Sequence, residues 1–321
     1  MNSPILSVVM SVYNAEKYLE QSIESILSQS FTDFEFLIIE DCSTDNSLEI
    51  LKNYEKQDSR IRVIQKTENK KMRGFIENLN IGLSEARGKY IARMDADDIS
   101  HLDRFEKQVL FLDSHPNVFM VGSAINFIDE NGKLIRKYKA LETDYEIKKQ
   151  MIKKISMYHP TIMFRNYKEI RYREKMFYCE DYDLYLRLML QDKIFANFSE
   201  ALLDYRLLNS SLSRRDSKFI KTLFVEKMKQ FYHEYRKKGK DSYEHFVPND
   251  LLNILNLDIK SSEKNLQFAL HIATKFGYKK VFTTLLQKYP NQKNIYTLKI
   301  LNSLPLIFSK IYFKFINNNN L

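Results

Sequence analysis

The 321-residue sequence contains few cysteines and no long apolar run. Its two cysteines, Cys42 and Cys179, match no zinc-binding or CxxC spacing, so we expect no site of either kind, and they suit a reducing compartment. Nowhere do 18 apolar residues follow one another, as a membrane-spanning helix would require. The early segment ILSVVMSVY is short and lacks a basic lead, so we do not interpret it as a secretory signal. We therefore expect a cytoplasmic protein that does not span a membrane.

Glycine is also scarce: the chain has seven, and none lies in the first predicted strand-to-helix turn, SVYNAEKY. A dinucleotide-binding Rossmann unit needs G-x-G-x-x-G in that turn, so that the backbone can approach a pyrophosphate closely. A Walker loop is absent as well. If the protein binds a nucleotide, its phosphates must therefore have a different counter-charge.

Apolar runs and helical stripes alternate along the first two-thirds of the chain. We predict strands over residues 6–13, 34–40, 60–65 and 89–95, and helices over residues 16–29, 43–57 and 75–86. This order predicts an α/β fold with a mostly parallel sheet flanked by helices. Ligands of such sheets bind beyond the carboxyl ends of the strands, which here are residues 11–14, 40–43 and 95–98.

Three carboxylates are crowded at the end of the fourth strand, in the segment YIARMDADDIS. Asp95 and Asp97 are two positions apart in an extended segment, so they project to the same side. Such a pair suits a hard divalent cation, Mg²⁺ or Mn²⁺, which keeps positions open for diphosphate oxygens. Alternatively, Asp97, Asp98 and Ser100 simply cap the helix predicted from residue 101.

Charge is distributed unevenly along the sequence. Residues 216–321 carry a net charge of +10, whereas residues 1–215 are close to neutral. We therefore predict a domain over residues 1–215 and a basic, mainly helical region over residues 216–321. In PLIFSKIYFKFI, Lys310 and Lys314 stand four apart among large apolar residues, which favours an anionic membrane surface as partner. Packing onto the first domain is the alternative, and no nucleic-acid-binding motif is present.

Several separated motifs occur in a defined order: SVVMSVYNAEKYLEQSIESILSQSF, FEFLIIEDCSTDNS, ARGKYIARMDADD and CEDYDLYLR. In this order they resemble the family 2 inverting glycosyltransferases, which have the GT-A fold, over roughly residues 4–213. The resemblance implies transfer of a sugar from a UDP-sugar, with inversion at the anomeric carbon and help from Mn²⁺ or Mg²⁺. Processive synthases of similar sequence have a QxxRW motif, and this chain contains no tryptophan.

The resemblance also assigns roles to residues at the strand ends. Ser11 and Tyr13 would line the nucleotide pocket, with Tyr13 stacked on the base. Glu40 or Asp41 would accept a hydrogen bond from the uracil imide, and Asp95 and Asp97 would contact the ribose or hold the metal. Each has a simpler interpretation: Tyr13 is an ordinary strand-end aromatic, and Glu40 and Asp41 form a solvated turn that caps the next helix. Asp45 is interpreted as a cap.

Further roles fall on residues later in the chain. Arg73 would reach the diphosphate or be one of several exposed cations, and its loop has about three more residues than the family pattern. The resemblance implies that Asp181 is the general base and that Glu180 lies on the acceptor side; acids at a helix N-terminus are also favourable without any catalytic role. The resemblance implies that the segment SMYHPTIMFR, with His159, lies on the acceptor side, although a buried hydrogen-bonding histidine is the simpler interpretation.

One family position departs from the pattern. Leu208 stands where the family often has a histidine, and Arg206 is the nearest candidate to replace it. We expect an enzyme that extends lipopolysaccharide, capsule or a lipid-linked oligosaccharide at the inner face of the plasma membrane. A catalytically inactive nucleotide-sugar sensor and a membrane or nucleic-acid adaptor are the alternatives.

Overall fold

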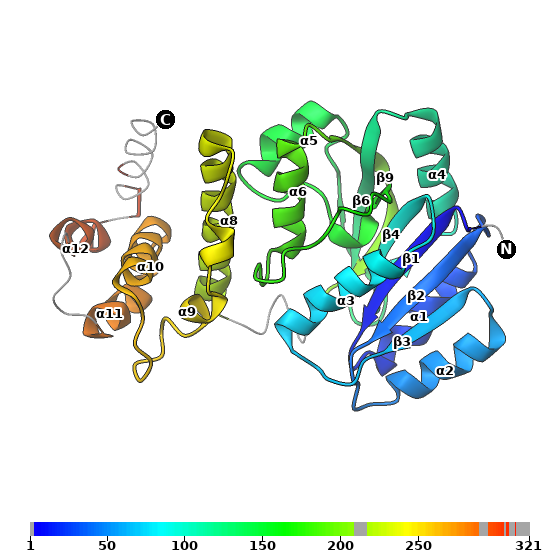
Figure 1. Cartoon of the computed structure of the whole chain (residues 1–321), viewed down its shortest axis with the longest axis horizontal. Coiled ribbons are helices and arrows are strands. Elements are labelled where there is room, and N and C mark those ends of the chain that lie inside the picture. Colours follow the sequence, from blue (N-terminus) through cyan, green and yellow to red (C-terminus); the bar gives the residue numbers. More distant parts are fainter. Residues whose placement is uncertain (1–2, 209–216, 289–294, 305, 308–311, 313–321) are drawn as a thin grey trace. The chain divides into compact units, whose positions relative to one another are not determined.

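The computed structural model describes residues 3–208, 217–288, 295–304, 306–307 and 312 (Figure 1). The chain divides into two compact units. The first comprises Met1–Glu174 and Glu180–Ser211, and the second comprises Lys175–Cys179 and Leu212–Leu321. Nothing in the sequence pattern indicated that residues 175–179 belong with the C-terminal region.

The first unit contains a nine-stranded sheet whose first half is parallel. Its neighbouring strands run in the order β3-β2-β1-β4, and the pairs among them are all parallel. Their bounds are β1 Leu6–Val12, β2 Phe34–Glu40, β3 Ile61–Gln65 and β4 Tyr90–Asp95. These are the four predicted strands, each within one residue of its expected bounds. β1 and β2 are buried nearly throughout, as continuous apolar runs predict.

The second half of the sheet is mixed. From β4 it continues β8-β6-β9-β5, with β7 paired to β6, and only the β6–β9 pair is parallel among these. The bounds are β5 Ile99–Ser100, β6 Val118–Ile128, β7 Leu134–Tyr138, β8 Met163–Arg165 and β9 Ile194–Arg206. The short β5 follows the acidic segment directly and pairs with the end of β9, so both ends of that segment belong to the sheet.

Helices flank the sheet (Figure 1). The predicted ones are α1 Glu16–Leu27, α2 Ser47–Gln57 and α3 Met72–Glu85, and they are followed by α4 Arg104–Ser114, α5 Asp144–Met151 and α6 Glu180–Leu190. α3 packs on β1 and β2, and α4 packs on β6. The apolar stripe of α1, with Leu19, Ile23 and Ile26, is completely buried in the main core. This burial supplies the hydrophobic stabilisation that holds the strand ends in place.

The first two strand-to-helix turns stabilise each other without glycine. Asn14 adopts a left-handed backbone with φ of 48°, a conformation that asparagine tolerates better than most residues. Its side-chain oxygen accepts a hydrogen bond from the backbone N–H of Thr44 (2.8 Å). In return, Asp45 accepts from the backbone N–H of Glu16 (3.1 Å) at the start of α1 and of Ser47 (3.0 Å) at the start of α2. The capping role predicted for Asp45 is confirmed, and it serves two helices.

Gly88 occupies a position where a side chain has no room. A Cβ atom there would lie 2.6 Å from the backbone nitrogen of Ser7 and 2.7 Å from the carbonyl carbon of Leu6, both in β1 or at its start. The backbone N–H of Gly88 donates to the Ser7 hydroxyl (2.8 Å), which donates to buried Glu35 (2.6 Å). This contact fixes the start of β4 against β1.

We predict that Gly88→Ala lowers the free energy of unfolding by about 1–3 kcal/mol, because the added methyl group must push β4 away from β1. Urea denaturation of the intact chain and the variant measures this difference. An unchanged urea midpoint would show that the close backbone approach at Gly88 is not needed for folding.

The second unit is mainly helical in its described part, which confirms that prediction. Its helices are α8 Lys218–Lys238, α9 Pro248–Leu252, α10 Glu263–Phe276, α11 Lys279–Lys288 and α12 Ile295–Ser303. Phe224 of α8 packs against the rings of Phe177 and Tyr178, with ring centroids 5.6 and 5.5 Å apart, which explains why residues 175–179 belong to this unit.

The predicted membrane-surface segment, residues 305–316, lies mostly outside the described residues, and so do Lys310 and Lys314. Within the described ranges, no helix combines the length and apolar character that crossing a bilayer demands.

Candidate active site

The ends of β1, β2 and β4 bring the predicted site residues to one edge of the sheet. In the strand register Ser11 is opposite Asp95, and Val12 is opposite Glu40. The Ser11 hydroxyl accepts a hydrogen bond from the side-chain amide of Asn78 (2.9 Å), a fully buried residue of α3. Tyr13 directly follows β1 and is 48% exposed, so its ring is free to contact a ligand.

Glu40 is committed to the turn that follows β2. Its side chain is completely buried, and its two carboxylate oxygens accept from the backbone N–H groups of Cys42 (3.2 Å) and Ser43 (2.5 Å). Cys42 has a left-handed backbone with φ of 60°, which these bonds help to hold. The interpretation of this pair as a solvated turn is wrong, because both Glu40 and Asp41 are buried.

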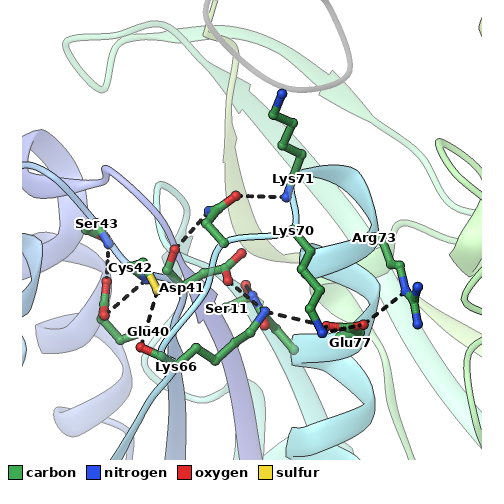
Figure 2. Close-up of polar contacts among 12 residues, drawn as sticks. Ser11, Glu40, Asp41, Cys42, Ser43, Lys66, Lys70, Lys71, Arg73 and Glu77 are labelled. Carbon is green, nitrogen blue, oxygen red and sulfur yellow. Dashed lines mark hydrogen bonds and ion pairs between the residues drawn. The ribbon is translucent and has the colours of Figure 1, made fainter.

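Asp41 has a different role, as Figure 2 shows. Its carboxylate pairs with the ammonium group of Lys66 (2.8 Å), and its backbone carbonyl accepts from the side-chain amide of Asn69 (2.8 Å). A Cβ atom on Gly74 would lie 3.0 Å from Asp41 Oδ2. A side chain at Gly74 would therefore press on the buried Asp41 carboxylate.

A group of cations surrounds Glu77 at the start of α3 (Figure 2). Arg73 Nε lies 3.0 Å from Glu77 Oε1, and Lys70 Nζ lies 3.4 Å from Glu77 Oε2. Arg73 is exposed and also pairs with Glu174 (3.2 Å). Lys71, which precedes the helix, has a left-handed backbone with φ of 55°. In this loop, where the sequence predicts extra residues, Lys70 and Arg73 face Glu77, whereas the Lys71 side chain points away from Asp41 (Figure 2).

The acidic segment forms a compact cluster. One carboxylate oxygen from each of Asp95, Asp97 and Asp98 lies within 4.8 Å of the others. Burial, followed by the charge of Asp95, raises the pKa of Asp97 above its ordinary value, and the same two causes raise the pKa of Asp98. The interpretation of Asp97, Asp98 and Ser100 as helix caps is wrong, because α4 begins only at Arg104, after Asp103. Asp98 instead accepts from the backbone N–H of Arg206 (2.8 Å).

Two buried arginines hold this cluster. Arg93, two residues before Asp95 on β4, is 5% exposed and pairs with the Asp95 carboxylate. Burial lowers the pKa of Arg93, but the charge of Asp95 outweighs this and keeps it above the ordinary value. Arg93 thus supplies a permanent positive charge under the acidic cluster.

Arg206 supports the cluster from the end of β9. Its guanidinium donates to the backbone carbonyl of Asp97 (2.8 Å), to the carbonyls of Asp129 and Glu130 (3.2 Å each) and to the side chain of Gln21 (2.7 Å). It also lies over the ring of Tyr18, 4.5 Å from the ring centroid. Because all three of its nitrogens bind the protein, Arg206 fixes the acidic segment and is not available to replace the family histidine at Leu208.

The second acidic cluster stands at the start of α6. Glu180 and Asp181 are half-buried, and Asp181 Oδ1 accepts from the backbone N–H of Tyr182 (2.6 Å). Burial raises the pKa of both carboxyls, and the charge of Asp181 raises that of Glu180 further. Arg93 and Asp95 both act electrostatically on Asp181. The two acidic clusters therefore belong to one site.

His159 lies under this site as a buried, neutral ring. Its Nε2 atom hydrogen-bonds the hydroxyl of Tyr172 (2.7 Å), and the backbone N–H of Tyr172 donates to Asn80 (2.8 Å) on α3. Burial, followed by the charge of Arg93, holds the pKa of His159 well below its usual range. The geometry matches the simpler interpretation of a hydrogen-bonded histidine, and a role toward the acceptor stays a prediction.

Sequence reasoning missed several residues of the site. Arg93 was read only as part of an apolar strand, although its position two residues before Asp95 places both side chains on one face of β4. Lys66 and Asn78 gave no local signal, because their partners Asp41 and Ser11 are distant in sequence.

Comparison with known proteins agrees with this geometry. The family model described as "Glycosyl transferase family 2" matches residues 7–191. Over 214 residues the chain is 39% identical to the uncharacterized glycosyltransferase MJ1057 of Methanocaldococcus jannaschii. This match covers 65% of the chain and 73% of MJ1057. Over 220 residues it is 35% identical to the O-antigen biosynthesis glycosyltransferase WbnJ of Escherichia coli. This match covers 65% of the chain and 82% of WbnJ.

Among solved structures, TarS 1–349 of S. aureus in complex with UDP-GlcNAc matches with a TM-score of 0.61 at 20% sequence identity. The match covers 86% of this chain and 82% of that one. This confirms the predicted GT-A fold.

The family model spans more than half of the chain, so the protein belongs to glycosyl transferase family 2, as its motifs predicted. The predicted class of enzyme, a nucleotide-sugar-dependent transferase, is confirmed with it.

Proposed function

We propose that the protein transfers a sugar from a UDP-sugar to a hydroxyl group of a surface-glycan acceptor, with inversion at the anomeric carbon. One observation carries this proposal: the charges of the Arg93–Asp95 pair, on β4, act on the carboxyl of Asp181 at the start of α6. A donor-binding group and a candidate base thus belong to a single site, as an inverting transfer requires.

The donor in this proposal is a UDP-sugar, as in the TarS complexes with UDP and UDP-GlcNAc. We assign the uracil contact to Asp41, because Glu40 uses both carboxylate oxygens on its own turn. Exposed Tyr13 stacks on the base, and Ser11 lines the pocket beside it. We assign the diphosphate contact to Arg73, which would have to exchange its ion pairs with Glu77 and Glu174 for the phosphates.

The residues at the end of β4 fit a divalent cation. Three carboxylates meet within 4.8 Å, and the pKa of Asp97 is raised by burial and by the charge of Asp95, a repulsion that a cation would relieve. Oxygen ligands of this kind suit Mg²⁺ or Mn²⁺, held by Asp97 and Asp95. When bound, the cation stabilises the negative charge of the departing UDP. Arg206 and Arg93 keep the cluster in place from below.

Asp181 is the proposed base. Burial raises the pKa of its carboxyl above the ordinary value of an aspartate, so once ionised it is a stronger proton acceptor than an exposed aspartate. An ionised carboxylate accepts the proton of the acceptor hydroxyl as the oxygen attacks the anomeric carbon. Glu180, its neighbour at the start of α6, is the proposed contact on the acceptor side.

The acceptor class follows from the relatives. WbnJ is named for O-antigen biosynthesis and a Bacillus subtilis relative for teichuronic acid biosynthesis. We therefore propose a lipopolysaccharide, capsule or lipid-linked glycan acceptor, modified at the cytoplasmic face of the plasma membrane.

A thermal-shift screen of nucleotide sugars with and without Mn²⁺ tests this proposal, because a ligand that binds only the native state raises its melting temperature. We expect at least one UDP-sugar to raise the melting temperature only when Mn²⁺ is present. If none of a broad panel does so, the proposed donor site is wrong.

The proposed membrane contact gives a separate prediction. Deleting residues from Pro305 onward should weaken binding to anionic vesicles and leave UDP-sugar binding intact, because Lys310 and Lys314 are lost while the nucleotide motifs remain. Each such cation contributes about 1 kcal/mol near an anionic surface, and salt screens it. Cosedimentation at several salt concentrations measures the effect. Equal sedimentation of both proteins would exclude these residues as the contact.

A further inference from the structure

The second unit contains a cavity that the proposed transfer does not use. It has a volume of about 210 Å³ and lies among α8, α9, the start of α10 and the loop between α8 and α9. On the same measure a single water needs only about 10–15 Å³. The cavity is therefore large enough for a ligand.

A buried cation lines this cavity. Lys227 of α8 is 6% exposed, and its ammonium group lies 3.0 Å from the neutral side chain of Gln230 and 4.4 Å from the centroid of the Phe268 ring. Burying an ammonium group is costly unless a negative charge compensates it. Burial, followed by the charge of Lys264, lowers the pKa of Lys227, and the charge of Glu234 opposes this only in part. The contacts of Lys227 therefore leave its charge uncompensated by a direct carboxylate partner.

Further positive potential comes from the start of α10. This 14-residue helix begins after its cap Ser262, which accepts from the backbone N–H of Asn265 (3.3 Å), and both residues line the cavity. The first turn of a helix presents backbone N–H groups and a partial positive charge. Exposed Lys264 adds a second ammonium group to the lining.

The other residues that line the cavity include both polar and apolar side chains. Ser242 and His245 add polar groups, and Phe231, Phe246 and Val247 form apolar walls. Asp250 is the one carboxylate among the lining residues, and it accepts from the side-chain amide of Asn265 (2.8 Å). Glu234 lies behind the lining: it accepts from Ser242 (2.7 Å) and from the side-chain amide of Gln230 (2.8 Å), and its charge partly offsets that of Lys227. Among the lining residues themselves, two lysines and a helix N-terminus face a single carboxylate, so the lining has a net positive charge.

We propose that this cavity binds a phosphate group, at a site separate from the donor site of the first unit. Lysine ammonium groups and the N–H groups of a first helical turn are groups that bind phosphate. The apolar walls and the cavity volume leave room for a molecule that carries the phosphate, either a sugar phosphate or a phospholipid headgroup. This inference does not depend on the proposed transfer reaction.

The test is a calorimetric titration of inorganic phosphate into the full chain, with UDP and Mg²⁺ in both solutions so that the first unit is occupied. We expect Lys227→Met to weaken phosphate binding by about tenfold or more, since a charge-assisted hydrogen bond is lost. Lys264→Gln, at an exposed position, tests the same cavity in case the first variant fails to fold. Lys280→Met removes the same charge from an exposed position on α11 outside the lining and should bind phosphate as the intact chain does.

Two further arms identify the source of the phosphate. Glucose 1-phosphate that binds more tightly than phosphate, with glucose as the control, would support a sugar phosphate. Phosphatidylglycerol vesicles that displace phosphate, when phosphatidylcholine vesicles do not, would support a headgroup. The proposal is overturned if the intact chain does not bind phosphate, or if the folded lysine variants bind it as tightly as the intact chain.

Discussion

Asp97→Asn is expected to abolish Mn²⁺-dependent donor binding and to leave a folded protein that is at least as stable as the original without metal. Asp97 is a carboxylate whose pKa is raised in the folded state by burial and by the charge of Asp95. A raised pKa means that the ionised form is disfavoured on folding, so the contribution of Asp97 to stability is full below its unfolded pKa and is lost as pH rises through the folded value. At neutral pH a neutral asparagine removes that penalty.

The same substitution removes a ligand from the proposed cation site. It should therefore not lower the melting temperature without metal, but it should abolish the rise in melting temperature that Mn²⁺ and a UDP-sugar cause. Thermal unfolding with and without Mn²⁺ and a UDP-sugar measures both. Asp33→Asn, at an exposed position before β2, is the matched control and should change neither. If Asp97→Asn still bound the donor with normal metal dependence, the interpretation of the acidic segment as a cation site would be wrong.

Asp181→Asn is expected to reduce turnover by roughly 10²–10⁴, the usual contribution of a positioned general base, and to leave donor affinity near normal. Asparagine is almost isosteric and keeps a side-chain oxygen that can accept from the backbone N–H of Tyr182, so the start of α6 should be preserved. What it loses is the ability to take a proton. Steady-state transfer rates and donor titration measure the two quantities separately.

Two results would contradict this role for Asp181. Turnover close to that of the unchanged enzyme would mean that another group is the base. Loss of donor binding in a folded variant would instead place Asp181 among the groups that hold the nucleotide sugar.

The parallel half of the sheet could be predicted because its signals are local. Each of its four strands is an apolar or alternating run followed by a helical stripe, and such patterns need no knowledge of distant residues. β6 and β9 are different. They pair in parallel with several shifts of register, and the paired residues are far apart in sequence, as Val118 and Ile194 are. That pairing depends on tertiary packing, which a local pattern does not contain.

The site shows the same division. The positions of Asp95, Asp97 and Asp181 could be predicted, because carboxylates at a strand end or a helix start are visible in the sequence; their roles come from the family resemblance and stay predictions. Their arginine partners were not: Arg93 was hidden in an apolar strand, and Arg206 was expected to bind ligand, whereas it binds the backbone of the acidic segment. Whether an arginine serves the ligand or the protein depends on the acceptors that surround it in the fold.

The measurement that tests the central claim most directly is UDP release from a panel of UDP-sugars in the presence of a glycan acceptor. The assay is run with Mn²⁺ and after its removal by chelation, and the anomeric configuration of the product is determined. We predict that one donor releases UDP and transfers its sugar with inversion, only when metal is present, and that Asp181→Asn abolishes most of this activity. Metal-dependent donor binding without transfer would indicate a catalytically inactive sensor. Transfer with retention, or transfer unaffected by chelation, would contradict the proposed mechanism.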